Sequence, residues 1–230
     1  MNDHLDLFPF EIEESTGNLV ALGGDLHPDR LLAAYRKGVF PWYSEHEPIQ
    51  WWSPNPRFVL FPSKLQVSHS MKPLLNQRRF RVTVDTHFEA VMTECARIKR
   101  NGQSGTWITA DMLEAYVGLH GRGYAHSVEV WDGETMAGGL YGLAIGHIFF
   151  GESMFSRVSN ASKYGLITLV RWLEAHGFDL IDCQQETAHL GSLGAQAMPR
   201  TQFLKILQHG IIQDQVPRLW THEFEEWLTP

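Results

Sequence analysis

Apolar residues recur at helical or strand spacing along most of the chain after residue 57. Leu166, Leu169, Val170 and Leu173 lie at positions i, i+3, i+4 and i+7, so they share one face of a predicted helix that ends at Gly177. Between the helical segments, short runs rich in β-branched and aromatic residues predict strands.

The periodicity predicts one element order for the chain. The expected strands are residues 58–61, 80–84, 125–131, 135–144, 147–151 and 179–184, and the expected helices are residues 28–37, a short segment after Ser70, 86–99, 109–122, 160–176 and 199–209. Asp132 and Gly133 are typical of a hairpin turn between two of these strands. Strands and helices mixed in this order predict an α+β fold built as α/β layers.

The first 57 residues differ from the rest, because only the helix at 28–37 is regular. Two aromatic segments follow it, residues 40–44 (FPWYS) and 51–57 (WWSPNPR), whose prolines exclude a helix and disfavour a central strand. We expect them to be rigid loops. The chain therefore divides into a small N-terminal domain with aromatic loops, residues 1–57, and a larger domain, residues 58–230.

Composition excludes several classes of protein. Apolar residues make up 43% of the 230 positions, which is too many for a disordered chain. No segment reaches the roughly 20 apolar residues that a membrane span needs, and no signal peptide is visible in the first ten residues. Only Cys95 and Cys183 are present, without a C-x-x-C motif. This pattern indicates a reduced, cytoplasmic protein.

Charge is unevenly distributed. The chain has a net charge of −7, but residues 64–100 hold eight Lys or Arg against three Asp or Glu. A basic patch on an acidic body is typical of a docking face for a polyanion, and a mixed, solvated surface is the alternative.

Two carboxylates and one amide are candidates for chemistry. Because strand residues alternate, Asp182 and Gln184 should share one face at the end of an apolar strand, which suggests a site; the alternative is that both brace a loop. Glu152 lies among apolar residues, so it must be paired, protonated or waiting for a cation, and Arg157 is its possible partner.

Other groups of residues give weaker evidence for a catalytic or binding site. A serine hydrolase would use Ser153, but Phe155 stands where the nucleophile turn needs glycine. Cys183 and His189 could form a thiol and base, although a buried cysteine is the more common arrangement. The twelve histidines form no metal-binding motif, and no phosphate-binding glycine loop is present, so we expect neither a metal nor a cofactor.

Four tryptophans, Trp42, Trp51, Trp52 and Trp107, fall outside the periodic stripes. Indoles beside a basic patch can stack on the unpaired bases at an RNA end. The alternative for Trp51 and Trp52 is that they fill the junction between the two domains.

Nine short segments in this order resemble the leucyl/phenylalanyl-tRNA-protein transferase family, from about residue 19 to residue 204. They are residues 22–26 (LGGDL), 38–42 (GVFPW), 51–57 (WWSPNPR), 105–108 (GTWI), 126–131 (HSVEVW), 138–142 (GGLYG), 151–156 (GESMFS), 160–163 (NASK) and 182–184 (DCQ). Ala137 departs from the branched aliphatic residue expected there, and residues 185–187 vary within the family.

The resemblance implies a fold and a reaction. The larger domain would be similar to the GNAT acetyltransferase superfamily and would be catalytic. The enzyme would move Leu or Phe from aminoacyl-tRNA to the α-amine of proteins that begin with Arg or Lys, which marks them for N-degron-dependent degradation. A monomer is the default expectation. The alternative from another class is a noncatalytic RNA-end binding module.

The resemblance also implies residue roles. Gln184 would orient the acceptor amine and help to remove its proton, Asp182 would polarise Gln184, and Glu152 would hold the cationic acceptor or the aminoacyl amine. Trp42 and Trp107 would hold the terminal adenosine, with Tyr35 and Tyr116 as neighbours. The apolar pocket for the Leu or Phe side chain would be formed by Leu140, Phe149, Met154, Leu166, Leu169 and Ile181.

Overall fold

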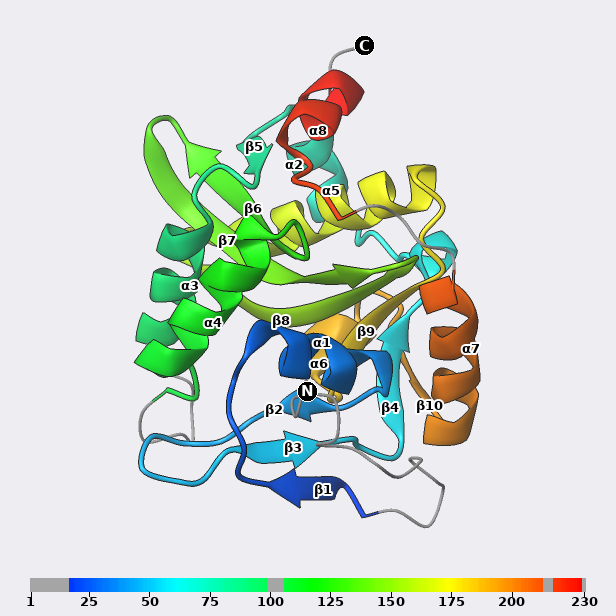
Figure 1. Cartoon of the computed structure of the whole chain (residues 1–230). Coiled ribbons are helices and arrows are strands. Elements are labelled where there is room, and N and C mark those ends of the chain that lie inside the picture. Colours follow the sequence, from blue (N-terminus) through cyan, green and yellow to red (C-terminus); the bar gives the residue numbers. More distant parts are fainter. Residues whose placement is uncertain (1–16, 99–105, 213–216, 229–230) are drawn as a thin grey trace.

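The structure is a computed structural model that describes residues 17–98, 106–212 and 217–228. A seven-stranded sheet lies at its centre, with helices on both faces (Figure 1). Its strands run in the order β10-β4-β9-β8-β7-β6-β5. Their bounds are β4 Arg57–Leu60, β5 Arg81–Val84, β6 Ala125–Asp132, β7 Thr135–Ile145, β8 Ile148–Ser156, β9 Leu180–Gln184 and β10 Gln196–Met198.

The helices divide between the two faces and bury two hydrophobic clusters. Helices α1, α3, α4 and α7 contribute to one cluster, and α2, α5 and α8 contribute to the other. The helix bounds are α1 Pro28–Arg36, α2 Met71–Asn76, α3 Phe88–Arg97, α4 Ala110–Gly121, α5 Ala161–Ala175, α6 Ala188–Gly191, α7 Arg200–Ile212 and α8 Thr221–Leu228. A 3₁₀ turn, η2, lies at Pro62–Lys64. The predicted mixture of α and β layers, with a small N-terminal part before a larger sheet-and-helix domain, is confirmed.

The prediction that the aromatic N-terminal segments are loops is wrong. Strands β1 Leu19–Leu22, β2 Phe40–Pro41 and β3 Gln50–Trp52 form a second sheet in which β3 is central. Strands of two to four residues are too short to show alternation in a sequence. Trp51 is fully buried and its indole N–H donates to the carbonyl of Gly23 at 2.9 Å, so it is core and not an exposed stacking surface.

The small sheet shares its core with the larger one, because Trp51 and Val59 belong to one hydrophobic cluster. A boundary between residues 57 and 58 stays a prediction. After residue 58 every predicted strand and helix is present, and its ends lie within a few residues of the predicted ones, except that β8 continues to Ser156. Elements η2, α6, β10 and α8 were not predicted. The first three have four residues or fewer and are too short to show periodicity. Helix α8 carries Phe224, Trp227 and Leu228 at helical spacing, a signal that the sequence analysis overlooked.

Two irregularities open the centre of the large sheet. Strands β8 and β9 form the sheet's parallel pair, and their pairing stops after Phe150 and Asp182. Beyond that point a β-bulge leaves Glu152 without a partner in β7, and a second bulge leaves Cys183 without a partner in β4. Bulges redirect side chains and are common beside active sites. The two strand ends therefore diverge and carry their side chains around an opening.

Helix α5 lies close to the sheet because it has a glycine where it crosses β6. A Cβ atom on Gly165 would meet Val130 Cγ2 at 2.6 Å, whereas one on Gly118 in α4 would meet nothing nearer than Pro28 Cγ at 3.9 Å. We expect Gly165→Ala to lower the free energy of unfolding by about 1–3 kcal/mol through overpacking. Gly118→Ala, its control, should raise it by about 0.5–1 kcal/mol. Urea unfolding measures both, and equal effects would contradict this account of the packing.

Candidate functional site

A pocket of about 470 Å³ lies where β8 and β9 diverge. Its volume is in the range of small-ligand sites. Nine of the predicted site residues line it: Trp42, Trp107, Leu140, Phe149, Glu152, Met154, Leu166, Ile181 and Gln184. The pocket is built from segments that lie as far apart in the sequence as β2 and α6.

The lining residues include two sets that differ in chemistry. Leu140, Phe149, Met154, Leu166 and Ile181 are apolar and belong to, or pack against, the hydrophobic cluster that contains α5. Phe40, Trp42 and Trp107 are aromatic and belong to, or pack against, the other cluster. Trp42 is half-buried and held by an edge-on contact with Trp52, whose indole N–H donates to the Trp42 carbonyl at 2.8 Å. Glu152 and Gln184 line the same pocket.

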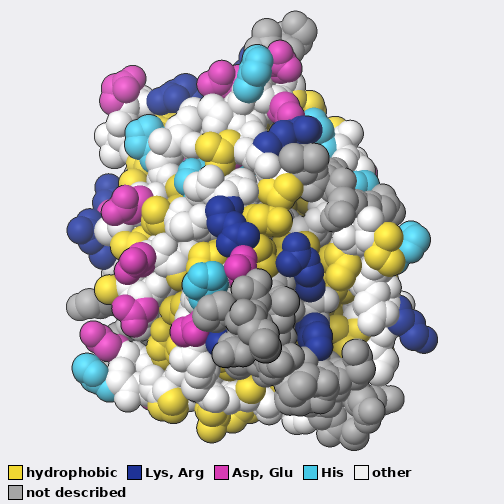
Figure 2. Space-filling view, viewed as in Figure 1, with side chains coloured by type: hydrophobic (Ala, Val, Ile, Leu, Met, Phe, Trp, Pro, Cys, Tyr) yellow, Lys and Arg dark blue, Asp and Glu magenta, His cyan; other side chains and the backbone are white. Residues whose placement is uncertain are grey.

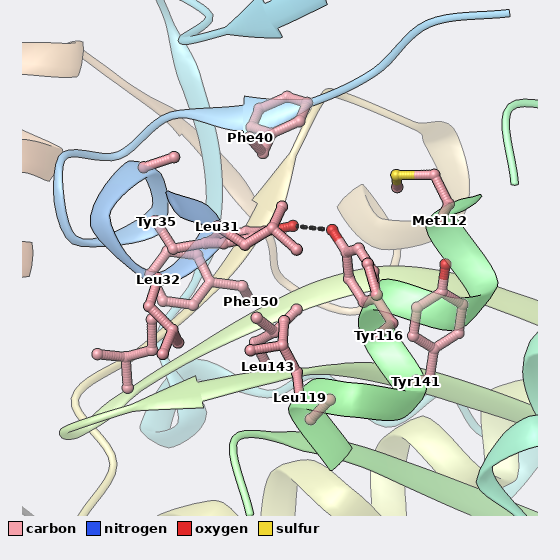
Figure 3. Packing of buried hydrophobic residues seen from close by; sticks show 14 of the residues in the cluster. Leu31, Leu32, Tyr35, Phe40, Met112, Tyr116, Leu119, Tyr141, Leu143 and Phe150 are labelled. Carbon is pink, nitrogen blue, oxygen red and sulfur yellow. Dashed lines mark hydrogen bonds between the residues drawn. The ribbon is translucent and has the colours of Figure 1, made fainter. Parts of the chain in front are cut away.

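The other four predicted site residues do not line the pocket. Leu169 is fully buried in the core of α5. Tyr35 and Tyr116 are also fully buried, and their hydroxyls contact each other (Figure 3). Asp182 is buried beneath the pocket wall. As the structure stands, none of the four is open to a ligand.

Asp182 forms a buried ion pair that the sequence analysis missed. Its carboxylate accepts two hydrogen bonds from Arg57, at 2.8 Å from Nε and 2.5 Å from Nη2. The guanidinium carbon lies 4.8 Å from the Phe40 ring centre and 4.7 Å from that of Phe203. The available signal was an Arg at the start of one apolar strand and an Asp within another, since buried charges must be paired.

The expectation that Asp182 and Gln184 share a strand face is wrong. The bulge at Cys183 and a left-handed φ of +61° at Gln184 break the alternation, so Gln184 lines the pocket together with Ile181 and Cys183. Asp182 Oδ1 instead accepts the backbone N–H of Gln184 at 2.9 Å. The carboxylate thus holds the backbone of Gln184, and its hydrogen bond is to the peptide group, not to the side-chain amide.

Glu152 is the titratable centre of the site. Its Oε1 accepts hydrogen bonds from Tyr35 Oη at 2.7 Å and from Gln184 Nε2 at 2.8 Å. Burial raises the pKa of Glu152 to about 8; the Tyr35 hydrogen bond opposes that rise, Asp182 adds to it, and Arg57 and Gln184 again oppose it. The alternative that Glu152 pairs with Arg157 is wrong, because Arg157 binds Glu94 at 2.6 Å.

Two nucleophile hypotheses lose support. Cys183 and His189 both line the pocket, but burial raises the pKa of the Cys183 thiol, and burial together with Lys163 lowers the pKa of His189. The thiol is therefore protonated at neutral pH. Ser153 lies inside β8, which continues to Ser156, and α5 begins only at Ala161. Ser153 is therefore not on the strand-to-helix turn that a hydrolase needs.

The basic window is only partly available for docking. Arg79 pairs with Asp132 and Arg97 with Glu94, while Lys64, Lys72 and Arg78 are exposed. Lys99 and Arg100 lie outside the described residues. On the face shown in Figure 2, Lys and Arg side chains lie scattered among Asp and Glu.

Within the described ranges, no group of three or more His, Cys, Asp or Glu could hold a metal ion. In the same residues, no helix combines the length and the apolar character required to cross a membrane.

Comparisons with known proteins agree on one family. The family described as leucyl/phenylalanyl-tRNA protein transferase matches residues 59–208, and its N-terminal domain matches residues 24–55. Relatives named leucyl/phenylalanyl-tRNA--protein transferase include those of Hydrogenovibrio crunogenus (52% identity, 92% of this chain and 82% of that protein) and Pseudomonas aeruginosa (57% identity, 90% and 89%). The solved structure of L-PGS from Bacillus licheniformis has a TM-score of 0.41 at 10% identity over 60% of this chain and 48% of its own, a partial likeness only.

The raised pKa of Glu152 predicts a pH-dependent stability. An ordinary Glu side chain has a pKa of about 4.3. Between that value and about 8 the folded protein keeps a proton that the unfolded chain has lost, so the stability contributed by Glu152 is complete at low pH and is lost as pH rises through about 8. Gln cannot titrate. We therefore expect the free energy of unfolding of Glu152→Gln, relative to the unsubstituted protein, to rise from pH 5 to pH 9.

Denaturant unfolding at a series of pH values measures this difference. Glu174→Gln, an exposed substitution on α5, is the matched control and should show no such trend. Parallel stability curves for Glu152→Gln and the unsubstituted protein would mean that Glu152 has an ordinary pKa.

Proposed function

The chain belongs to the leucyl/phenylalanyl-tRNA-protein transferase family, and from this premise we propose that it moves Leu or Phe from aminoacyl-tRNA to the α-amine of proteins beginning with Arg or Lys. The enzyme is an acyltransferase that carries an aminoacyl group from tRNA to protein. The identity of the donor and acceptor residues, the marking of the product for N-degron-dependent degradation, the cytoplasmic location and the monomeric state are parts of the proposal.

The pocket, whose lining combines an apolar set and an aromatic set, carries this proposal. Leu140, Phe149, Met154, Leu166 and Ile181 offer only apolar contacts, which suits a Leu or Phe side chain. Such a surface discriminates against smaller residues by about 1–3 kcal/mol for each missing methylene. Trp42 and Trp107 offer indole rings on which the terminal base of the tRNA would stack.

The reaction needs orientation and a proton acceptor rather than a covalent nucleophile. The donor is an ester, so the acceptor amine attacks its carbonyl carbon, an N–C bond forms, and the bond from that carbon to the ribose oxygen breaks. The amine gives up a proton and the ribose oxygen gains one. An α-amine has a pKa of about 7.7–8.0, close to the pKa of about 8 of Glu152, so proton transfer between them is nearly balanced.

Gln184 is the orienting group in this proposal. A side-chain amide accepts and donates hydrogen bonds but is not a base at neutral pH, so the ionised form of Glu152, which becomes populated as pH approaches about 8, takes the proton. The Gln184 Nε2 group donates to Glu152, which leaves its carbonyl oxygen as the end that can accept a hydrogen bond from the attacking amine. Asp182 acts through the backbone of Gln184, which it holds at 2.9 Å.

The exposed basic residues supply a surface for the tRNA. Lys64 lies on η2, Lys72 on α2 and Arg78 beyond its end, and both elements pack against α5, whose Leu166 lines the pocket. Phosphates of the acceptor stem would meet these side chains while the aminoacylated end enters the pocket.

The defining experiment measures transfer of labelled Leu from charged tRNA to a peptide that begins with Arg. We expect transfer to this peptide and none to the same peptide with Ala first or with an acetylated α-amine. Binding of charged tRNA without transfer would favour the noncatalytic RNA-end binding module, and release of free Leu without a peptide product would favour hydrolysis.

Substitution of Gln184 separates catalysis from binding. Gln184→Ala should lower kcat by about a hundredfold, because the attacking amine loses its orienting group, while charged tRNA binds with nearly unchanged affinity. Gln185→Ala, which removes the neighbouring pocket amide, is the matched control and should retain most of the activity. A parallel loss of turnover and tRNA affinity in Gln184→Ala would contradict the assigned role.

A further inference from the structure

We infer that the buried hydroxyls of Tyr35 and Tyr116 are positioning groups for Glu152, and that they form a directed hydrogen-bond chain that holds its carboxylate ready to accept a proton. The inference rests on the proposed role of Glu152 as proton acceptor. It gives these tyrosines a task different from contact with the tRNA, which their burial prevents.

The chain of contacts crosses three elements. Tyr116 on α4 and Tyr35 on α1 have hydroxyl oxygens 2.5 Å apart, and Tyr35 Oη lies 2.7 Å from Glu152 Oε1 on β8. Figure 3 shows the two hydroxyls pointing toward one another inside a shell of apolar residues, among them Phe150 and Leu119. Tyr35 packs edge-on against Phe150, with ring centres 5.1 Å apart.

The direction of the chain follows from counting protons. Tyr35 has one hydroxyl proton and donates it to Glu152, so in the contact between the two tyrosines Tyr116 must be the donor. Burial, with the nearby Glu152 charge, raises the pKa of both phenols well above the usual value, so both keep their protons at physiological pH. The chain therefore runs from Tyr116 through Tyr35 to the carboxylate.

Two hydrogen bonds to Glu152 converge on one oxygen. Oε1 accepts from Tyr35 on α1 and from Gln184 on β9. Donors from two different elements fix the orientation of the carboxylate. Donation to the ionised form also opposes the effect of burial, so without Tyr35 the carboxyl would hold its proton too firmly to act as an acceptor.

The pKa of Glu152 depends on every group that faces it. Asp182 from β9 disfavours its ionised form, and Arg57 from β4, Gln184 from β9 and Tyr35 from α1 favour it. Tyr116 acts through Tyr35, because a hydroxyl that accepts a hydrogen bond is a stronger donor, and the Tyr116 hydroxyl also interacts with Glu152 itself. Removal of the Tyr35 hydroxyl must therefore raise the pKa of Glu152, and removal of the Tyr116 hydroxyl must raise it by less.

The test compares Tyr35→Phe and Tyr116→Phe with Tyr164→Phe. Tyr164 lies on α5 against Phe80 and has no contact with Glu152, so it is a matched loss of one hydroxyl. The infrared carboxyl band of Glu152, assigned by its absence from Glu152→Gln, is titrated in each folded variant. We expect the midpoint to rise most in Tyr35→Phe, less in Tyr116→Phe and not at all in Tyr164→Phe.

A kinetic readout accompanies the titration. The acid limb of the kcat pH profile should move to higher pH in the same order, with KM for charged tRNA unchanged. Because Tyr35→Phe leaves the Tyr116 hydroxyl without an acceptor, the double variant, which removes both hydroxyls, is measured too and should shift like Tyr35→Phe.

The outcomes separate the two claims. A midpoint in folded Tyr35→Phe or in the double variant that equals the unsubstituted one overturns the inference, as does an equal shift in Tyr164→Phe. If the unsubstituted protein transfers no amino acid, the proposed function fails, while the infrared titration still reports whether the tyrosines control Glu152.

Discussion

The buried ion pair between Arg57 and Asp182 is the contact on which the site depends. The guanidinium contacts the rings of Phe40 and Phe203, so β2 and α7 pack against a charge that Asp182 on β9 neutralises. Removing one member of such a pair leaves an uncompensated charge, at a cost of about 3–5 kcal/mol. The packing of the small sheet against the large one and the shape of the pocket wall are therefore set by the same pair.

The ion pair acts on the reacting groups through the backbone of Gln184. Asp182 holds the N–H of Gln184, a non-glycine residue at a positive φ, and Gln184 in turn donates to Glu152. A left-handed conformation is unfavourable for a residue with a Cβ atom and persists only where neighbouring contacts impose it. On the other side of Glu152, Tyr35 and Tyr116 bring α1 and α4 to the same carboxylate. Glu152 is thus held by contacts from β9 within the sheet and from two helices on one face of the sheet.

The sequence predicted those parts of the fold and the site that depend on local patterns of residues. Periodicity located the strands and helices after residue 58, and the family resemblance named Trp42, Trp107 and the apolar residues that line the pocket. Sequence reasoning wrongly put Asp182 and Gln184 on one strand face, because a bulge and a positive φ leave no mark on an alternating pattern. It also missed Arg57 as the partner of Asp182, 125 positions away, and it read Tyr35 and Tyr116 as ligand contacts. Long-range pairing of polar groups has no periodic signature.

The distances along the chain between these partners have a consequence for synthesis and folding. Tyr35 meets Glu152 across 117 residues, and the last residues that line the pocket, His189 and Leu190, come late in the chain. Contacts between distant segments form slowly, because the entropy of closing a long loop is lost before the contact is gained. The pocket lining therefore cannot be complete until α6 has left the ribosome. A nascent chain that ends before α6 lacks one wall segment of the site.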